Sequence, residues 1–547
     1  MLRFCRRGTL QIEILNKSAG MGRKNGMDKG KQSVIELILK ADEEWNHQNY
    51  EEYYNDIRLG LSYDPANSEL YLMLGMYYSL KNPEQAYLCY KQALYYCDNE
   101  EDRHIIWGFL TDLVQAHRIL IPKISIVILS FNQLELTKQC IESIRKNCNR
   151  ESYELIVVDN ASKENVRNWL KQQDDMKLIL NSENNGFPKG CNQGIACAGK
   201  DNDILLLNND IIMPQNALFW LQMGLYEAKD IGAAGSVSNN AVNYQQVSEH
   251  FATVEEWLEY AKAVNLPSHF AYEFKGWLMG FAMLIRRKAL DEVGYLDEQF
   301  SPGNYEDNDL SIRLLTNGYK LLLCKNSFIF HYGGSSFKKN SSYMELLERN
   351  REKLAVKYQF DYVPFSVVDR NIIDCIKQTE EPVKVLEYGC KLGCTLARIK
   401  SIYPQSYVLG VEPREELYRL AKQVTNVIQA DDKNIESKLK NQTFDYIILD
   451  NTIHLGEPET LLLHLKKLLH NDGKIIISFQ NKQYVQDVEK AGDTIGMSLE
   501  EMVTLCNKLS ISIFDVCYQK GKLPYEEESR ESMLSSMKSF IMVLKNC

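Results

Sequence analysis

Four apolar residues run into two amides and a carboxylate in the stretch Ile204-Leu205-Leu206-Leu207-Asn208-Asn209-Asp210-Ile211-Ile212-Met213-Pro214. A short apolar run without alternation is typical of a parallel strand that is buried on both faces. Its polar end is expected at the carboxyl edge of the sheet, where open α/β sheets bind their ligands. A carboxylate at that place suits a bound cation, because an unpaired charge is costly to bury. An ordinary Asn/Asp turn is the alternative.

Two earlier stretches have the same design. Ile124 to Ser130 is an apolar strand followed by Asn132, and Glu154 to Asp159 is another that ends in a carboxylate. Helical patterns separate the strands, and this alternation predicts right-handed crossovers and a parallel sheet. Polar side chains from three strand ends are therefore expected along one edge of that sheet.

The overall composition limits the possible functions. A chain of 547 residues predicts about three domains. A net charge of −10 argues against a nucleic-acid binder that relies on phosphate contacts. The 14 cysteines show no CxxC pair, which favours a reducing, cytoplasmic location. No apolar run approaches the roughly 18 residues of a membrane span, although peripheral contact with a membrane stays open.

Residues 1–31 are predicted to be a disordered tail, and residues 32–120 to be helical. Within 32–120, two segments share a spacing of four and then three residues, and Leu74-Gly75 precedes Tyr78. The spaced positions are Tyr53, Ile57 and Gly60 in the first segment and Ala86, Tyr90 and Ala93 in the second. This pattern resembles the tetratricopeptide repeat, whose period is 34 residues. Such repeats present concave surfaces that hold a peptide or a protein partner. A helical cap that only packs on the next domain is the alternative.

Residues 121–345 resemble a family 2 glycosyltransferase with the GT-A fold. The motifs that carry the resemblance occur in one order along the chain: Ser130-Phe-Asn132, Val158-Asp159-Asn160-Ala-Ser162, Asn185-Gly186 with Asn192 and Gly194, Leu207-Asn208-Asn209-Asp210, Glu306-Asp307-Asn-Asp309-Leu-Ser-Ile-Arg313, and Phe330-His331-Tyr-Gly-Gly334-Ser. The chain is not a Rossmann dehydrogenase, because no GxGxxG follows the first strand.

The resemblance implies a nucleotide-sugar donor. Asp159 would contact the base, and Ser130 and Asn132 would hold the nucleoside. Lys189 could meet a phosphate as a point charge. Trp277 could stack on a sugar, although a lone aromatic is more often part of the core. The full set of expected donor-binding residues is Ser130, Asn132, Asp159, Asn185, Lys189, Asn208, Asn209 and Trp277.

The resemblance also implies a divalent cation, Mn²⁺ or Mg²⁺. The Asp-x-Asp site of the family is Asn208-Asn209-Asp210 here, one carboxylate short. Metal binding would then rest on Asp210 and His331, with further oxygen ligands from the donor phosphates. An ordinary histidine at a strand end is the alternative for His331.

The acidic pair Glu306-Asp307 precedes a helix expected from Asp309 to Thr316. Acidic residues at a helix start are favoured by capping and by the helix dipole, which is one interpretation. The resemblance implies the other: Asp307, with Glu306 as second choice, is the base that deprotonates the acceptor hydroxyl in an inverting transfer. Asp309 and Arg313, spaced by four, are predicted to form a structural pair.

Residues 346–375 are predicted to be a helical linker, and residues 376–547 a second α/β domain. The order of its strands is similar to class I S-adenosylmethionine (SAM) methyltransferases. The resemblance implies SAM contacts at Glu387, Gly389, Gly393 and Glu412. Lys391 departs from the Gly-x-Gly-x-Gly loop of that family and could crowd the methionine part. A working methyltransferase and a decayed domain kept for folding or partner contacts both stay open.

Together these features predict a metal-dependent glycosyltransferase that modifies a protein, flagellin being one guess, or a surface glycan. Methylation by the C-terminal domain stays open as a second activity. One rival hypothesis is a SAM-dependent glycan methyltransferase whose GT-A domain only binds the sugar. Another is a scaffold that binds nucleotide-sugars without turnover, which the missing carboxylate at Asn208 keeps open.

Overall fold

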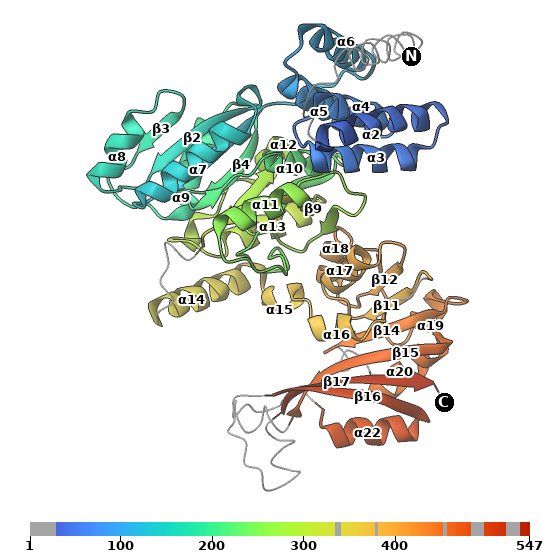
Figure 1. The fold of residues 1–547 in the computed structure, drawn as a ribbon. Coiled ribbons are helices and arrows are strands. Elements are labelled where there is room, and N and C mark those ends of the chain that lie inside the picture. The colour runs from blue at the N-terminus through green and yellow to red at the C-terminus, as the bar shows by residue number, and fades with distance from the viewer. Residues whose placement is uncertain are drawn as a thin grey trace. The chain divides into compact units, whose positions relative to one another are not determined.

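The computed structural model describes residues 29–333, 341–377, 381–451, 457–482, 497–520 and 537–546. Gly334 of the transferase motifs and His454, a polar residue of the last domain, lie outside these residues. The chain divides into two compact units, residues 1–117 and residues 118–547. Figure 1 shows the elements of each.

The first unit is all helical within its described residues, as predicted. Its helices are α2 (Lys29–Asn46), α3 (Tyr50–Tyr63), α4 (Ser68–Ser79), α5 (Pro83–Tyr96) and α6 (Glu100–His117). Asn67 and Asn82 cap α4 and α5 by accepting hydrogen bonds from backbone N–H groups of the first turn. The helices pack closely, because a Cβ on Gly75 would lie 2.3 Å from the Tyr90 ring. The tetratricopeptide assignment stays a prediction.

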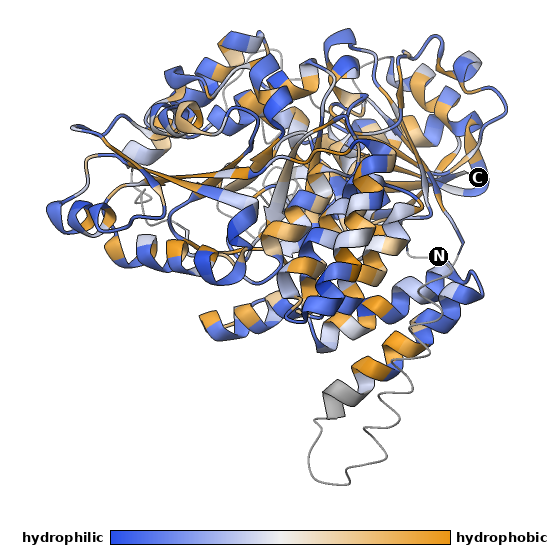
Figure 2. Ribbon diagram, turned by 90° about the horizontal axis from the view of Figure 1, so that it is seen from above, coloured by the Kyte–Doolittle hydropathy of each residue, from blue (hydrophilic) through white to orange (hydrophobic). Residues whose placement is uncertain are grey.

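The second unit begins with an eight-stranded sheet in the order β3-β2-β1-β4-β8-β6-β9-β7. Its strands are β1 (Ile124–Ser130), β2 (Tyr153–Asp159), β3 (Lys177–Leu180), β4 (Asp203–Asn208), β6 (Ile231–Val237), β7 (Tyr272–Phe274), β8 (Ala282–Ile285) and β9 (Lys320–Phe328). A separate pair, β5 (Ile211–Ile212) and β10 (Phe330–His331), runs antiparallel. The central strands are almost entirely buried, and Figure 2 shows strands coloured as hydrophobic.

The sheet is mixed, which corrects the expectation of a parallel sheet. Strands β3, β2, β1 and β4 are parallel as predicted. Strand β8 then runs antiparallel to both β4 and β6. Since Ala282 pairs with Leu207, β8 starts at the carboxyl edge of β4. The preceding residues Gly280 and Phe281 are thereby delivered to the edge that carries Asn208.

Most helices of this domain pack against the sheet. The helices are α7 (Leu134–Asn147), α8 (Glu164–Lys171), α9 (Phe187–Cys197), α10 (Ala217–Leu225), α11 (Val254–Val264), α12 (Arg287–Val293) and α13 (Glu306–Thr316). Helix α9 lies close to the sheet because a Cβ on Gly194 would be 2.4 Å from Val127. Helix α13 begins at Glu306, three residues earlier than expected.

The chain continues through α14 (Ser341–Tyr358), α15 (Val363–Ser366) and α16 (Arg370–Asp374) into a seven-stranded sheet of order β13-β12-β11-β14-β15-β17-β16. The last domain contains β11 (Lys384–Tyr388), α17 (Cys394–Ile402), β12 (Tyr407–Val411), α18 (Glu415–Ala421), β13 (Val427–Ile428), α19 (Ile435–Lys438), β14 (Phe444–Asp450), α20 (Pro458–Lys467), β15 (Leu469–Gln480), α22 (Leu499–Lys508), β16 (Ile511–Lys520) and β17 (Met537–Asn546). Strand β17 is antiparallel to both of its neighbours. The predicted α/β class is confirmed: two domains built on β-sheets follow a helical region.

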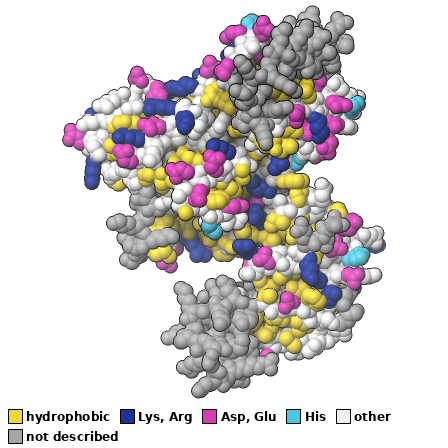
Figure 3. All heavy atoms as spheres, viewed as in Figure 1, with side chains coloured by type: hydrophobic (Ala, Val, Ile, Leu, Met, Phe, Trp, Pro, Cys, Tyr) yellow, Lys and Arg dark blue, Asp and Glu magenta, His cyan; other side chains and the backbone are white. Residues whose placement is uncertain are grey.

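Among the described residues, no helix is both long and apolar enough to pass through a bilayer. Figure 3 shows acidic and basic side chains interspersed on the face that it draws.

Candidate active site

The donor-side residues lie where β1 and β2 end. Ser130 and Asp159 are paired in the register of these two strands, and both are buried. The Ser162 N–H donates to Asp159 Oδ2 at 3.2 Å, and Arg167 Nε lies 3.5 Å from the same oxygen. Asp159 Oδ1 is buried and has no hydrogen-bond partner among the described residues. A buried carboxylate oxygen of this kind needs a donor, which a bound ligand could supply.

Other expected donor-binding residues hold backbone in place. Asn132 Oδ1 accepts from the Lys163 N–H at 3.0 Å, and the Asn185 N–H donates to Asn160 Oδ1 at 3.2 Å. Asn209 Nδ2 donates to Thr137 Oγ1, which lies 3.4 Å from Ser130 Oγ. Asn209 is therefore directed to the Ser130 side of the edge.

Two further residues of the donor set are Lys189 and Trp277. Lys189 is exposed on the first turn of α9. Trp277 is partly buried and packs against the hydrophobic core, and its carbonyl accepts from Asn243 Nδ2 at 2.9 Å. Among the described residues, neither side chain forms a hydrogen bond or an ion pair with another residue of the site.

The candidate metal ligands meet through the antiparallel pair β5–β10. Pairing of His331 with Ile211 brings the imidazole beside Asp210, and His331 Nε2 lies 3.2 Å from Asp210 Oδ1. Asn208 Nδ2 lies 3.4 Å from the same ring nitrogen. No group of three or more His, Cys, Asp and Glu that could hold a metal occurs in the described part of the chain. The protein would thus supply two such ligands.

The imidazole of His331 is fixed from two sides. Its Nδ1 lies 2.8 Å from the Asn240 carbonyl oxygen, which orients Nε2 toward Asp210. The Phe281 ring stacks on it with centroids 5.1 Å apart. These residues fit a hard divalent cation, which accepts carboxylate oxygen and imidazole and takes its other ligands from phosphates and water.

The sequence did not identify Asn240 or Phe281 as site residues. Residues 236–274 match no motif. Within them, Asn239 and Asn240 bind the backbone of residues 331 and 332 and the His331 ring. The consecutive amides after the apolar strand β6 were the available signal.

The acidic pair opens α13. Asp307 Oδ2 accepts from the Gly280 N–H at 3.0 Å, and its Oδ1 accepts from the Asn308 N–H at 2.8 Å. Glu306 is buried, and its Oε2 has no hydrogen-bond partner among the described residues. Burial, and then the charge of Asp307, raise the pKa of Glu306 to about 8. Burial also raises the pKa of Asp307, against the effect of its backbone donors.

The predicted structural pair is confirmed. Arg313 Nε lies 2.9 Å from Asp309 Oδ2, and the guanidinium also donates to the carbonyls of residues 293, 294 and 295. Asp309 further accepts from Lys357 and Tyr358 of α14. Asp309 is therefore committed to anchoring α13, which leaves Asp307 as the carboxylate that the site can use.

Phe281 joins Asp307 to the Asp210–His331 pair. Its neighbour Gly280 binds Asp307, its own carbonyl accepts from the Asn208 N–H at 2.9 Å, and its ring stacks on His331. One short segment thus contacts the acidic pair, the tip of β4 and the histidine. Residues 125–294 match the family model described as glycosyl transferase family 2. This chain contains a family 2 glycosyltransferase domain. A second family model, described as methyltransferase domain, matches residues 358–517.

Two solved glycosyltransferase structures are similar to part of this chain. The mannosyltransferase PcManGT from Pyrobaculum calidifontis, in complex with GDP-Man and Mn²⁺, has 14% identity and a TM-score of 0.32, over 56% of this chain and 74% of its own. GalNAc-T7 with UDP, GalNAc and Mn²⁺ has 14% identity and a TM-score of 0.35, over 52% and 55%.

A solved methyltransferase structure is also similar to part of this chain. The plantazolicin methyltransferase BpumL, in complex with a triazolic desmethylPZN analog and SAH, has 20% identity and a TM-score of 0.25, over 32% of this chain and 81% of its own. Scores this low do not indicate what this protein binds. A search of curated proteins returns no match to the sequence.

Proposed function

We propose that the protein is a metal-dependent inverting glycosyltransferase that moves a sugar from a nucleotide-diphosphate donor to a hydroxyl group. The observation that carries the proposal is the segment Gly280-Phe281, which connects Asp307 to the Asp210–His331 pair. An inverting transfer needs a base on the acceptor side and charge stabilisation on the diphosphate side of one anomeric carbon.

The donor nucleoside would lie at the ends of β1 and β2. Asp159 Oδ1 is buried without a hydrogen-bond partner in the described residues, and a nucleobase N–H group would satisfy it. Arg167, whose Nε lies 3.5 Å from the same carboxylate, helps to orient it. Ser130, on the adjacent strand, would face the same ligand.

Asp210 and His331 would hold the divalent cation, with Asn208 able to contribute its side-chain oxygen. A divalent cation bound there stabilises the negative charge on the departing diphosphate as a Lewis acid. His331 offers Nε2 because its Nδ1 is engaged by the Asn240 carbonyl.

Asp307 would accept the proton of the acceptor hydroxyl. As that O–H bond breaks, the oxygen forms a bond to the anomeric carbon and the bond to the diphosphate breaks on the opposite face, which inverts the centre. The backbone N–H groups of Gly280 and Asn308 donate to the Asp307 carboxylate and fix its position. Glu306, with a pKa raised to about 8, stays protonated at neutral pH and places no second negative charge beside the base.

The acceptor is proposed to be a protein, such as flagellin or another surface protein, or a surface glycan. The helical region of residues 32–120, whose sequence pattern resembles a tetratricopeptide repeat, favours a protein, because such repeats commonly bind peptides. A scaffold that binds nucleotide-sugars without turnover is the second candidate. Asn208, standing where the family has a carboxylate, favours it.

A donor-hydrolysis screen tests the proposal. The full chain is incubated with a panel of nucleotide-sugars in Mn²⁺ or in EDTA, and the released nucleotide diphosphate is measured. We expect release from one donor, its loss in EDTA, and a loss of at least tenfold in Asp210→Ala. The control is Asp230→Ala, which removes a partly exposed carboxylate paired with Lys320 in the same domain.

The outcomes separate the candidates. Release that survives both EDTA and Asp210→Ala would refute metal dependence. Nucleotide-sugar binding by calorimetry without any release, even with acceptor extracts, would support the scaffold. Neither binding nor release from any donor would refute both.

A further inference from the structure

The glycine loop of the C-terminal domain is crossed by a side chain. Lys391 stands at the middle position of the loop and adopts the left-handed conformation, with a φ of 59°, between Gly389 and Gly393. Its Nζ lies 2.5 Å from Asp450 Oδ2 at the tip of β14. Both side chains are largely buried. The lysine therefore spans the edge of the sheet from the β11 loop to β14, over the tip where SAM was expected.

The expected ribose-binding carboxylate is already saturated. Glu412 is fully buried, and its Oε1 accepts from Arg414 N and Nε at 3.0 and 2.7 Å. Its Oε2 accepts from Lys391 N and Arg414 Nη2 at 2.8 and 3.0 Å. A carboxylate offers about four lone-pair sites. None remains for two ribose hydroxyls. The Arg414 guanidinium is itself held 4.9 Å from the Phe365 ring of α15.

The charges at this edge also cancel. Lys391 pairs with Asp450, and Arg414 pairs with Glu412. Burial, and then the charge of Asp450, raise the pKa of Glu387. SAM carries a sulfonium, an ammonium and one carboxylate, so its net charge is positive. The two ion pairs leave neither Asp450 nor Glu412 free to attract that charge. The residues present do not fit the cofactor.

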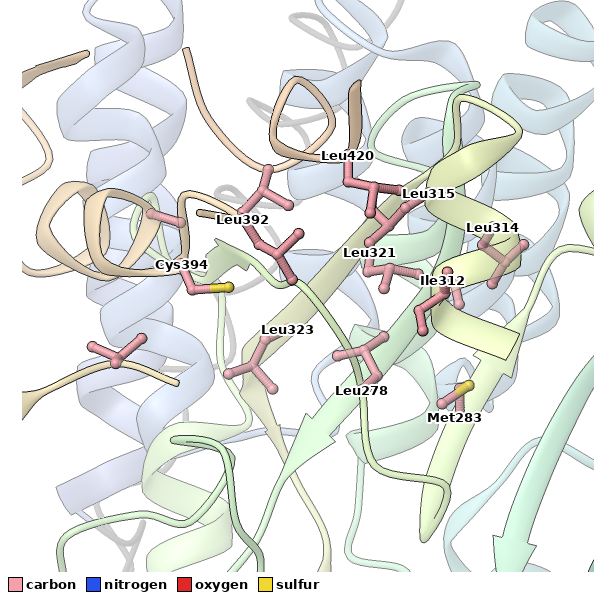
Figure 4. Packing of buried hydrophobic residues seen from close by; sticks show 14 of the residues in the cluster. Leu278, Met283, Ile312, Leu314, Leu315, Leu321, Leu323, Leu392, Cys394 and Leu420 are labelled. Atoms are coloured by element: carbon pink, nitrogen blue, oxygen red, sulfur yellow. The ribbon is translucent and has the colours of Figure 1, made fainter. Parts of the chain in front are cut away.

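The same loop is used by the transferase domain. A Cβ on Gly276 would lie 2.8 Å from Cys394 Sγ and 3.4 Å from Leu392 Cδ1. The Gly276 carbonyl accepts from Tyr362 Oη at 2.6 Å in a buried hydrogen bond. Figure 4 shows Leu392, Cys394 and Leu420 beside Leu278, Leu315, Leu321 and Leu323 in one buried cluster.

A buried charge cluster adds to this contact. Glu273 at β7 lies 3.1 Å from Lys275 Nζ and 2.8 Å from Arg398 Nη1 of α17. Glu273 and Lys275 are almost completely buried. The segment from Lys275 to Gly280 is therefore anchored at its start by the C-terminal domain and bonded at its end to Asp307.

We infer that the C-terminal domain braces the 275–280 segment of the transferase and does not take up SAM, because its own ion pairs and loop contacts occupy the cofactor edge. This inference has two halves. The brace half, in which the C-terminal domain supports the 275–280 segment with Arg398 as a positioning residue, rests on the proposed transfer activity. The cofactor half, in which the domain does not take up SAM, does not depend on that activity.

Calorimetry tests the cofactor half. The full chain is titrated with SAM and with SAH up to 1 mM, and we expect no saturable heat from either. Saturable binding of SAM with a Kd below about 0.1 mM would overturn this half, whatever the transferase activity.

Arg398→Met tests the brace half. On the donor found in the hydrolysis screen, we expect kcat to fall at least tenfold while the donor KM stays within about twofold, because the donor side is not touched. Arg398→Lys, which keeps the charge, should restore part of kcat. The control is Arg419→Met on α18, a largely exposed arginine paired with Glu415.

An unchanged kcat in folded Arg398→Met, or an equal loss in Arg419→Met, would overturn the brace. A fall in kcat/KM that comes only from a higher donor KM would also overturn the brace. A wild-type chain that releases no nucleotide would remove the basis of the brace, and calorimetry would still decide the cofactor half.

Discussion

Glu306→Gln should remove a large part of the pH dependence of stability. The pKa of Glu306 is raised from 4.5 to about 8, and each pKa unit corresponds to about 1.4 kcal/mol. A carboxyl that binds its proton more tightly when folded loses stability as pH rises above the unfolded pKa, until it ionises in the folded state as well. Linkage over pH 6 to 9 gives a loss of about 2.5 kcal/mol for this one group. Glutamine is an isostere of the protonated form and carries no such loss.

The measurement is urea unfolding of wild type and Glu306→Gln at pH 6 and pH 9, followed by tryptophan fluorescence. That signal suits the question, because none of the six tryptophans lies in residues 376–547 and four lie in residues 121–345. We expect wild type to lose about 2.5 kcal/mol more than the variant. Glu259→Gln, whose side chain is 71% exposed, is the control. Equal losses in wild type and Glu306→Gln would refute a protonated Glu306 at neutral pH.

Three other changes have defined outcomes. Asp307→Asn should lower the transfer rate by about 10²- to 10⁴-fold with donor affinity unchanged, and a variant of wild-type rate would exclude Asp307 as the base. Glu273→Gln leaves Lys275 buried without its carboxylate and should cost about 3–5 kcal/mol at pH 7 in urea unfolding. Burial acts to raise the pKa of Glu273, but the charges of Lys275 and Arg398 outweigh it and lower that pKa. The difference in unfolding free energy between wild type and Glu273→Gln should therefore narrow below about pH 4, and a constant difference would contradict this. Gly75→Val should destabilise the first unit by about 1–3 kcal/mol against the Tyr90 ring and speed proteolysis there, whereas Gly108→Ala, whose Cβ meets nothing within 4 Å, should not.

Strand β2, which ends at Asp159, and strand β4, which ends two residues before Asp210, could be predicted from the sequence, because continuous apolar runs with polar ends are a local signal. The start of α13 at the acidic pair was misplaced by three residues, since helix propensity does not fix a boundary. The reversal of β8 depends on pairing with β4 and β6, which no local pattern records. The support of His331 by Asn240 joins residues 91 positions apart, and it could not be read from either segment alone.

The sequence indicated the C-terminal domain through its strand order and through Glu412, which lies at the expected strand end. Its departure at Lys391 was visible as a residue out of pattern. Lys391 pairs with Asp450, and Arg414 pairs with Glu412. These pairs become evident only in the folded domain, where the ends of the strands lie side by side.

The buried cluster that includes Leu278, Leu315, Leu392 and Cys394 has a consequence for how this protein can change over time. A gene rearrangement that separated the coding segments near residue 376 would leave apolar surface on both products and invite aggregation. The two halves must therefore be inherited together, and substitutions on one side of the cluster are expected to select compensating ones on the other. Homologues should show such paired changes before they show the transferase half alone.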